Sequence, residues 1–423
     1  MQHCDTLIAP RWCVPVEPAG IVLSDHAVAV SDGRILELLP LSKATRKYQP
    51  SVLIRRPNHL LIPGLVNTHT AAAMSLLRGF GGDLPHETWL KERIWPAERR
   101  WVSAEMVRDG TELAIAEMIQ AGITCFSDQY YFPEIVAETA VDLNMRAMIG
   151  TLIMDAPTSW ADNAEECLRK GSDLVHDPYA EHPLISSCYA PHSLGALAEE
   201  SFTDIRVMAD QLDVPVQVHL HETETEIAAS VAETGKRPFE RLDELGLVNA
   251  SLLAVHAVHL TESETERCAE TGVSIAHCPR SNLKLASGIA PISRYRRAGI
   301  NVGIGTDGAA SNNVLDVLEE VRLASLLARA QSNNAAIITP ADALRMGTLD
   351  SARALGLADS IGTLEGGKHA DLACFDLSSL NSQPVYDVLS TLIFASNSSP
   401  VSYTHLTLPT INGECGWGGW AWR

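Results

Sequence analysis

Short apolar runs alternate with amphipathic stretches along the chain from about residue 60 onward. Helical periodicity is clearest in Ala104–Gln120, Glu200–Leu212, Glu262–Glu270 and Leu315–Ala330. Eight apolar runs have the length of buried strands: Leu61–Val66, Ile123–Ser127, Arg146–Leu152, Leu184–Ala190, Val214–Leu220, Leu252–Ala257, Val273–Ala276 and Val302–Gly305. Eight strands, most of them followed by a helix, predict an α/β fold of the (β/α)8 TIM-barrel type. An open doubly wound sheet uses the same units, but no glycine-rich dinucleotide fingerprint follows the first run.

The two ends of the chain have a different pattern. Ala27–Val30 and Ile35–Leu38 flank a turn at Asp32-Gly33, which predicts a β-hairpin. Near the other end, Pro340–Leu355 has the pattern of one more helix, and Ile361–Asp376 returns to strands and turns. We therefore expect both chain ends to join in one small β-sandwich domain beside the barrel.

The predicted boundaries divide the chain into four parts. Residues 1–59 and 359–400 would form the small β-domain, and residues 60–358 the barrel. Residues 401–423 show no strand or helix pattern, and Ser402–Thr410 resembles a translated sequencing adapter. We interpret this last part as a foreign tail.

Composition limits the partners of the protein. The 423 residues include 46% hydrophobic and 20% charged residues, and the formal net charge is −20. Such a surface repels phosphate backbones and anionic lipids, so we expect neither nucleic acid nor membrane as a partner. A small neutral or cationic molecule fits better, and a homo-oligomeric state is compatible with the sequence.

The cysteines indicate a reducing compartment. There are nine, an odd number, and none belongs to a C-x-x-C pair, which is typical of buried reduced thiols. Met1–Pro10 contains no basic segment followed by an apolar run, and no apolar run reaches the roughly 18 residues of a membrane span. We expect a cytoplasmic protein.

Imidazoles and carboxylates recur where the predicted strands end. They are His69 at the first strand, His192 at the fourth, His219 and Glu222 at the fifth, His256 at the sixth, His277 at the seventh and Asp307 at the eighth. In a TIM barrel the C-terminal strand ends form one mouth, so these groups are expected to converge. A single histidine at a strand end is more often structural, but imidazoles or carboxylates at the ends of six strands of one rim favour a functional site.

The residue types indicate metal chemistry. Two or three imidazoles with one carboxylate and an open position form the ligand set of a catalytic zinc ion, which activates water near neutral pH. Glu222 lies three residues after His219, past the strand end, so it can move protons without binding the metal. We expect one zinc ion per chain, with another divalent metal as the alternative.

Several stretches resemble one family in detail. They are Pro63–His69, Ser75–Gly79, Ile94–Glu98, His219–Thr223, His277–Pro279, Ser281–Leu285 and Gly305–Asn313. The chain resembles the amidohydrolase superfamily over roughly residues 5–398. The resemblance is to the branch of methylthioadenosine/S-adenosylhomocysteine deaminases, which is related to the triazine hydrolases. It implies a TIM barrel, a bound metal ion and hydrolytic loss of ammonia from C6 of an adenine ring.

The resemblance also implies roles for residues at matching positions. His69, His219 and Asp307 would bind the metal, and Asp307 would take part in catalysis. Glu222 would be the proton shuttle that protonates the ring nitrogen. His256 would orient the attacking hydroxide.

Substrate contacts are implied in the same way. Glu98 would accept hydrogen bonds from ribose hydroxyls, and His192 would help to hold the substrate. The expected substrate is 5'-methylthioadenosine, S-adenosylhomocysteine or adenosine. His221 and His259 receive no role, and we interpret them as structural.

One position departs from the family pattern. The family has H-x-H at the end of the first barrel strand, and here Ala71 occupies the second position. A methyl group cannot bind a metal, so one alternative is a catalytically impaired ligand-binding relative. Because relatives in this branch differ mainly in the loops over the mouth, a related amidohydrolase acting on guanine or a triazine also stays open.

Overall fold

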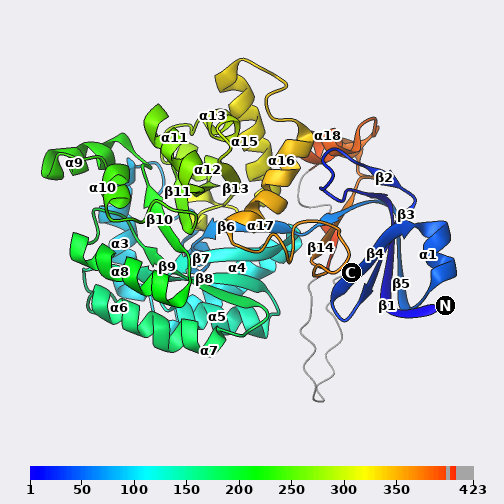
Figure 1. The fold of residues 1–423 in the computed structure, drawn as a ribbon, viewed down its shortest axis with the longest axis horizontal. Helices are drawn as coiled ribbons and strands as arrows, with labels where there is room; N and C mark the ends of the chain where they lie inside the picture. The colour runs from blue at the N-terminus through cyan, green and yellow to red at the C-terminus, as the bar shows by residue number, and fades with distance from the viewer. Residues whose placement is uncertain (397–400, 406–423) are drawn as a thin grey trace.

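The structure is a computed structural model that describes residues 1–396 and 401–405. Its strands form two sheets, a parallel sheet of eight strands and a mixed sheet of seven. Figure 1 shows the parallel sheet among helices in one part of the molecule and the mixed sheet, with the N-terminus, in another. This arrangement confirms the predicted fold class, a barrel with a small β-domain. The exact domain boundaries stay a prediction.

The strands of the parallel sheet pair in chain order from β6 to β13. Their bounds are β6 Leu65–Thr70, β7 Ile123–Tyr130, β8 Arg146–Ile153, β9 Ile185–Pro191, β10 Val216–Leu220, β11 Leu252–His256, β12 Ser274–His277 and β13 Asn301–Ile304. The longer helices between them include α4 Ala104–Gln120, α5 Pro133–Asp142, α8 Glu199–Leu212, α11 Glu262–Thr271 and α15 Val317–Ser332. Each predicted run overlaps one strand of the parallel sheet, so the predicted eight-stranded barrel is confirmed.

The first predicted barrel strand begins too early. Leu61 belongs to β5 (Tyr48–Pro63), where it pairs with Cys374 in the mixed sheet. The chain passes into the barrel at Gly64, where a Cβ atom would lie 2.0 Å from Thr124 Oγ1. Because the residues on both sides of Gly64 are buried, the apolar run conceals this change of sheet.

The barrel closes between β6 and β13 at its C-terminal rim. The carbonyl oxygen of His69 accepts hydrogen bonds from the backbone N–H groups of Thr306 (3.1 Å) and Asp307 (2.9 Å). The side-chain oxygen of Asn67 also accepts from the Thr306 N–H at 3.0 Å. The seam therefore joins the first and last strands through residues at the predicted site.

Deeper in the seam, the segment after β13 takes the place of a strand partner. The Val66 N–H donates to the carbonyl oxygen of Gly347 at 2.9 Å. This contact lies where the predicted helix Pro340–Leu355 is interrupted, since the structure has α16 (Pro340–Met346) and α17 (Leu349–Ala354) instead. The prediction of a single helix was wrong because Gly347 turns its carbonyl toward the barrel.

The mixed sheet is built from both ends of the chain. Its order is β15-β14-β5-β1-β3-β4, with β2 paired to β1. The bounds are β1 Gln2–Cys13, β2 Leu23–Ser24, β3 His26–Ser31, β4 Arg34–Pro40, β14 Leu372–Asp376 and β15 Val401–His405, in addition to β5. Strands β3 and β4 form the predicted hairpin around Asp32-Gly33.

Apolar side chains cover both faces of the mixed sheet. Leu7 and Ala9 pack with Ala44 of α1 (Leu41–Lys47) on one face, whereas Ile8 packs on the other face with Leu364. Alternate residues of a strand point to opposite faces, so β1 contributes to both layers. The small domain therefore has two apolar layers around one sheet.

The expectation of no regular structure from residue 401 onward was wrong for the first residues. Val401–His405 forms β15, which pairs antiparallel with β14. The free edge of β14 offers backbone partners, and Val, Tyr and Thr favour extended conformations. The foreign origin of the tail stays a prediction, and residues 406–423 lie outside the described residues.

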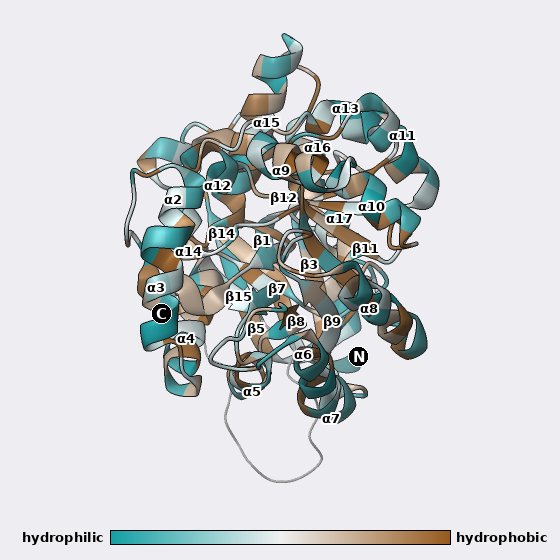
Figure 2. Ribbon diagram, turned by 90° about the vertical axis from the view of Figure 1, so that its left-hand side faces the viewer, coloured by the Kyte–Doolittle hydropathy of each residue, from teal (hydrophilic) through white to brown (hydrophobic). Residues whose placement is uncertain are grey.

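Hydropathy follows the architecture. Figure 2 shows hydrophilic residues on outer helices such as α8 and α10 (Pro238–Glu244), whereas strands such as β11 are largely hydrophobic. Within the described ranges no helix combines the length and apolar character of a membrane span. The eight cysteines in these ranges are all buried and form no disulfide with one another.

A buried ion pair links the barrel to the small domain. Arg146 of β8 donates from Nε to Asp371 Oδ2 at 3.0 Å, and the two side chains are 6% and 3% exposed. Removing one member of such a pair leaves a poorly compensated buried charge. We predict that Arg146→Met lowers the free energy of unfolding by about 3–5 kcal/mol in urea denaturation.

The control for this prediction is a surface pair of the same type. Arg108 Nη2 lies 2.9 Å from Glu138 Oε2, and both side chains are partly exposed. We expect Arg108→Met to cost less than about 1 kcal/mol. Equal losses for the two variants would contradict the role assigned to the buried pair.

Candidate active site

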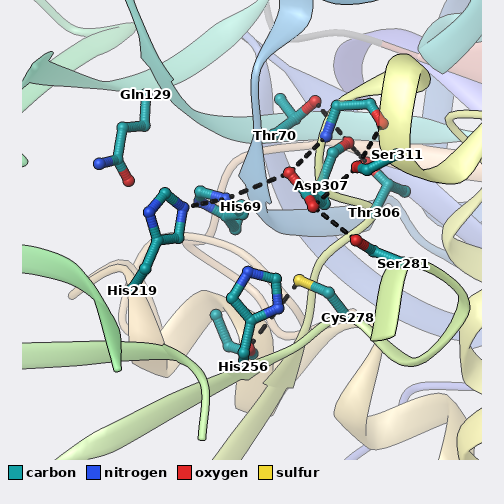
Figure 3. A network of polar contacts seen from close by, with 12 residues as sticks. His69, Thr70, Gln129, His219, His256, Cys278, Ser281, Thr306, Asp307 and Ser311 are labelled. Carbon is teal, nitrogen blue, oxygen red and sulfur yellow. Dashed lines mark hydrogen bonds and ion pairs between the residues drawn. The ribbon is translucent and has the colours of Figure 1, made fainter. Parts of the chain in front are cut away.

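Three imidazoles meet at the mouth of the barrel. His69, His219 and His256 come from the ends of β6, β10 and β11, and each offers one ring nitrogen within 4.8 Å of the other two. The Nε2 atoms of His69 and His219 are 3.3 Å apart, and His69 Nε2 is 3.6 Å from Asp307 Oδ1. Figure 3 shows the three rings and the Asp307 carboxylate facing one another. The predicted convergence of these strand-end residues is therefore observed.

Asp307 is fixed by donors on both carboxylate oxygens. Oδ2 accepts hydrogen bonds from Ser281 (2.6 Å) and Ser311 (2.8 Å), and Oδ1 accepts from the Gly308 N–H (2.7 Å). Burial alone would raise the pKa of Asp307, but the hydrogen bond and charge of His69 hold it well below its usual range. The carboxylate is therefore ionised and held in one orientation.

The imidazole rings are also fixed through their second nitrogen. His219 Nδ1 donates to the backbone carbonyl of His192 at 2.7 Å, and His256 Nδ1 lies 2.8 Å from Asn282 Oδ1. Since these oxygens accept, Nε2 of each ring keeps its lone pair. Burial lowers the pKa of His219 well below its usual range, and the nearby His69 lowers it further. His219 is therefore a neutral ring, the form that binds metals.

This donor set fits a divalent metal ion. Ligands of one tetrahedral zinc, with zinc–nitrogen bonds of about 2.0–2.1 Å, lie about 3.3–3.4 Å from each other. The 3.3 Å between His69 and His219 agrees with this spacing, and Asp307 adds an anionic oxygen beside them. Neutral imidazoles with one carboxylate are ligands that suit zinc and its neighbours in the first transition series.

Glu222 lies beside the cluster, between the imidazoles of His256 and His86. Its Oε2 is 3.8 Å from His256 Nε2, and its Oε1 is 3.8 Å from His86 Nε2. Ser287 Oγ donates to Oε1 at 3.4 Å. His86 belongs to α2 (His86–Trp89), in the segment that follows β6. A carboxylate in this position can exchange protons with a molecule bound at the mouth.

Glu98 is buried near the end of β7. It lies on α3 (Trp95–Trp101), is 8% exposed and accepts hydrogen bonds from Tyr130 (2.9 Å) and Tyr131 (3.4 Å). Burial raises the pKa of Glu98 to about 7, and the two tyrosine hydroxyls oppose this shift. A carboxylate with lone pairs left over can accept hydrogen bonds from a polyol.

The remaining predicted histidines have separate places. The His192 ring lies at the mouth, with its centroid 5.1 Å from that of His219. His221 is buried away from the cluster, where its ring nitrogens contact the Phe239 N–H and Arg237. His259 Nε2 lies 2.7 Å from the Ser287 carbonyl oxygen. These contacts agree with structural roles for His221 and His259.

Ala71 borders the cluster. A Cβ atom added to Gly308, the residue after Asp307, would lie 3.3 Å from the Ala71 methyl group. The next N–H, that of Ala72, donates to Asp128 Oδ1 at 2.7 Å. Asp128 Oδ2 is buried and has no hydrogen-bond partner among the described residues. A polar side chain at position 71 would thus have both a metal-type cluster and an unpaired acceptor nearby.

Sequence comparison places this arrangement in a family. A profile described as the amidohydrolase family matches residues 60–406. The chain belongs to the amidohydrolase family. A protein of Teredinibacter turnerae named 5-methylthioadenosine/S-adenosylhomocysteine deaminase is 43% identical over 401 residues, which are 94% of this chain and 90% of that protein. The resemblance inferred from the motifs, and the expectation of a hydrolytic enzyme, are confirmed.

Two solved structures have the same fold. An adenosine deaminase from Xanthomonas campestris, solved with bound zinc, has a TM-score of 0.95 and 48% identity, and the match covers 96% of this chain and 92% of that one. Atrazine chlorohydrolase from Arthrobacter aurescens, in complex with zinc, has a TM-score of 0.87 at 24% identity, with 95% and 94% covered. At that identity the second likeness shows the fold alone.

Sequence reasoning missed several residues that contact the predicted ones. They are His86, Gln217, Asn282, Ser281, Ser311 and Asp128. Gln217, whose amide nitrogen is 3.1 Å from His69 Nδ1, lies two residues before His219 on β10. Strand alternation could have identified it, because side chains two residues apart share a face. His86 lies outside every motif, and nothing in the sequence singles it out.

The raised pKa of Glu98 predicts a pH-dependent effect on stability. A pKa near 7 in the folded protein, against 4.5 as the ordinary value, means that folding favours the protonated form. The contribution of Glu98 to stability therefore falls as pH rises from about 4.5 to 7. Glu98→Gln removes this titration. We expect its melting temperature relative to wild type to be higher at pH 8 than at pH 4.

Differential scanning fluorimetry at the two pH values measures this difference. Glu112→Gln, on the exposed side of α4, serves as the control and should show the same difference at both pH values. A pH-independent difference for Glu98→Gln would contradict the raised pKa.

Proposed function

We propose that this protein is a zinc-dependent hydrolytic deaminase of adenine nucleosides. The substrates would be 5'-methylthioadenosine, S-adenosylhomocysteine or adenosine, and the products the inosine analogue and ammonia. The observation that supports this best is the cluster of His69, His219 and Asp307 with Glu222 beside it. The names of the relatives, deaminases of methylthioadenosine and adenosine, support the same substrate class.

In this proposal His69, His219 and Asp307 hold the zinc ion. When bound, zinc supplies the positive charge that activates a water molecule at neutral pH. The water oxygen adds to C6 of the adenine ring, the bond from C6 to the amino nitrogen breaks, and ammonia leaves. The protein supplies the proton transfers and holds the substrate.

In this proposal Glu222 transfers the protons. It is fixed by Ser287 and flanked by His256 and His86, so its carboxylate faces the mouth. As a general base it would accept a proton from water, and as a general acid it would protonate the ring nitrogen. It would then carry the remaining hydroxyl proton to the amino group, which leaves as ammonia. These steps use one carboxylate, so the net charge of the site is restored after each turnover.

Glu98 and His192 would hold the nucleoside. Glu98 is already oriented by Tyr130 and Tyr131, which leaves lone pairs for the ribose hydroxyls. His192 lies next to His219 at the same mouth. Ribose contacts at Glu98 would separate a nucleoside deaminase from enzymes that act on free bases or triazines.

The first test is a substrate panel with zinc-loaded protein. We expect ammonia release from at least one of the three nucleosides, and a loss of about 100- to 10 000-fold in kcat for Glu222→Gln with zinc content unchanged. Guanine and a chlorotriazine complete the panel. Turnover of either of these, with none of the nucleosides, would reject the proposed substrate class.

The second test restores the family pattern at position 71. We expect Ala71→His to raise zinc affinity by at least about tenfold and to raise kcat, because an imidazole there can add a ligand. Ala71→Leu, which fills space without a donor, is the matched control and should raise neither. If the natural chain is inactive and only Ala71→His deaminates nucleosides, the protein is an impaired relative rather than an active enzyme.

A further inference from the structure

The metal site of this chain has a gap where its family has a second histidine on the first barrel strand. Position 71 is alanine, and its methyl group borders Gly308 beside the carboxylate of Asp307. With His69, His219 and Asp307 alone, the site offers two imidazoles and one carboxylate. Another protein donor near these atoms would raise the number of protein ligands to four, and a water molecule could then be the fifth ligand, a coordination number that zinc can adopt.

The described residues contain one candidate for that donor. His256 forms the group of three imidazoles with His69 and His219, with the ligand atoms within 4.8 Å of one another. The rings of His219 and His256 have centroids 5.4 Å apart, and those of His69 and His256 are 6.1 Å apart. His256 therefore lies close to both of the other rings.

The orientation of the His256 ring suits a ligand. Asn282 Oδ1, 2.8 Å from Nδ1, accepts the ring proton, so the lone pair is on Nε2. That nitrogen faces Glu222 Oε2 at 3.8 Å, beyond hydrogen-bond distance. A cation beside these two atoms would be attracted by the Glu222 carboxylate.

The backbone holds His256 in this position at a cost. His256 has a φ of 69° and Ala257 has a φ of 45°, so two successive residues other than glycine adopt left-handed conformations. Such conformations persist where the surrounding structure enforces them, and they cluster at functional sites. Here the bend directs the end of β11 into the mouth.

Other nearby donors are less suitable. The Cys278 thiol donates to the backbone carbonyl of Ala276 at 3.9 Å and is outside the group of three. The His192 and His277 rings are outside the group of three. Glu222 is the residue that the proposed reaction needs for proton transfer.

We propose that His256 binds the metal ion in this chain and compensates for Ala71, so that the ligand set is His69, His219, His256 and Asp307. This inference rests on the proposed zinc binding but not on deamination. It differs from the role that the resemblance implies, in which His256 orients the attacking water. The effects of positions 71 and 256 on zinc affinity would then be coupled. Removing the ligand at one position would lower zinc affinity most when the other position has no ligand.

The coupling is measured with a double-mutant cycle in which zinc affinity is determined in the absence of substrate. His256→Asn is made in the natural chain and in the Ala71→His variant, and zinc affinity is obtained by competition with a chromogenic chelator. We expect a loss of more than about 100-fold in the natural chain, and a loss at least about tenfold smaller in the Ala71→His chain. Equal losses in the two backgrounds would overturn the proposal.

His192→Asn is the matched control, because it removes an imidazole from the same mouth but from outside the group of three. Its effect on zinc affinity should be the same in both backgrounds. A background-dependent effect as large as that of His256→Asn would show that the coupling is not specific to His256, which also overturns the proposal.

A spectroscopic count of ligands covers the case in which His256→Asn does not fold. X-ray absorption at the zinc edge of the unaltered full-length protein should show scattering from three imidazoles, and two would overturn the proposal. Because neither measurement uses substrate, a protein with coupled zinc binding and no deamination would refute the proposed function alone. A protein that deaminates nucleosides but binds zinc without coupling would refute this inference alone.

Discussion

The hydrogen bonds across the barrel seam determine the geometry of the site. The His69 carbonyl oxygen accepts from the backbone N–H groups of Thr306 and Asp307, so the first and last strands meet at the rim. The same three residues include the imidazole and the carboxylate that lie 3.6 Å apart. Asp307 has a left-handed φ of 59°, which turns its side chain back toward His69. The hydrogen bonds that close the barrel therefore also bring the imidazole of His69 and the carboxylate of Asp307 together.

Burial then decides the protonation states at this rim. Desolvation lowers the pKa of His192 and His219, which keeps these rings neutral, while His69 and hydroxyl donors keep Asp307 ionised. A set of neutral imidazoles around one anion attracts a divalent cation, whereas protonated rings would repel it.

The sequence predicts the barrel well because strand and helix periodicities are local properties. It also predicts that His69, His219 and Asp307 converge, because parallel strands end at one rim. It fails where contacts between distant segments decide the outcome. Gly347 interrupts a helix because its carbonyl bonds to Val66, and Val401–His405 becomes a strand because β14 offers an edge. His86 reaches Glu222 from a segment without any periodic pattern, so its place depends on how that segment packs over the mouth.

The alanine at position 71 does not change the orientation of the other site residues, because none of the hydrogen bonds that hold them involves the Ala71 side chain. His219 is oriented by a backbone carbonyl, His256 by Asn282, and Asp307 by two serines. Asp128 Oδ2 has no hydrogen-bond partner among the described residues, and Oδ1 of the same carboxylate accepts from the Ala72 N–H next to position 71. Burial raises the pKa of Asp128 to about 7, so near neutral pH a proton can reduce the cost of this missing contact. The orientation of the other candidate ligands therefore does not depend on the side chain at position 71.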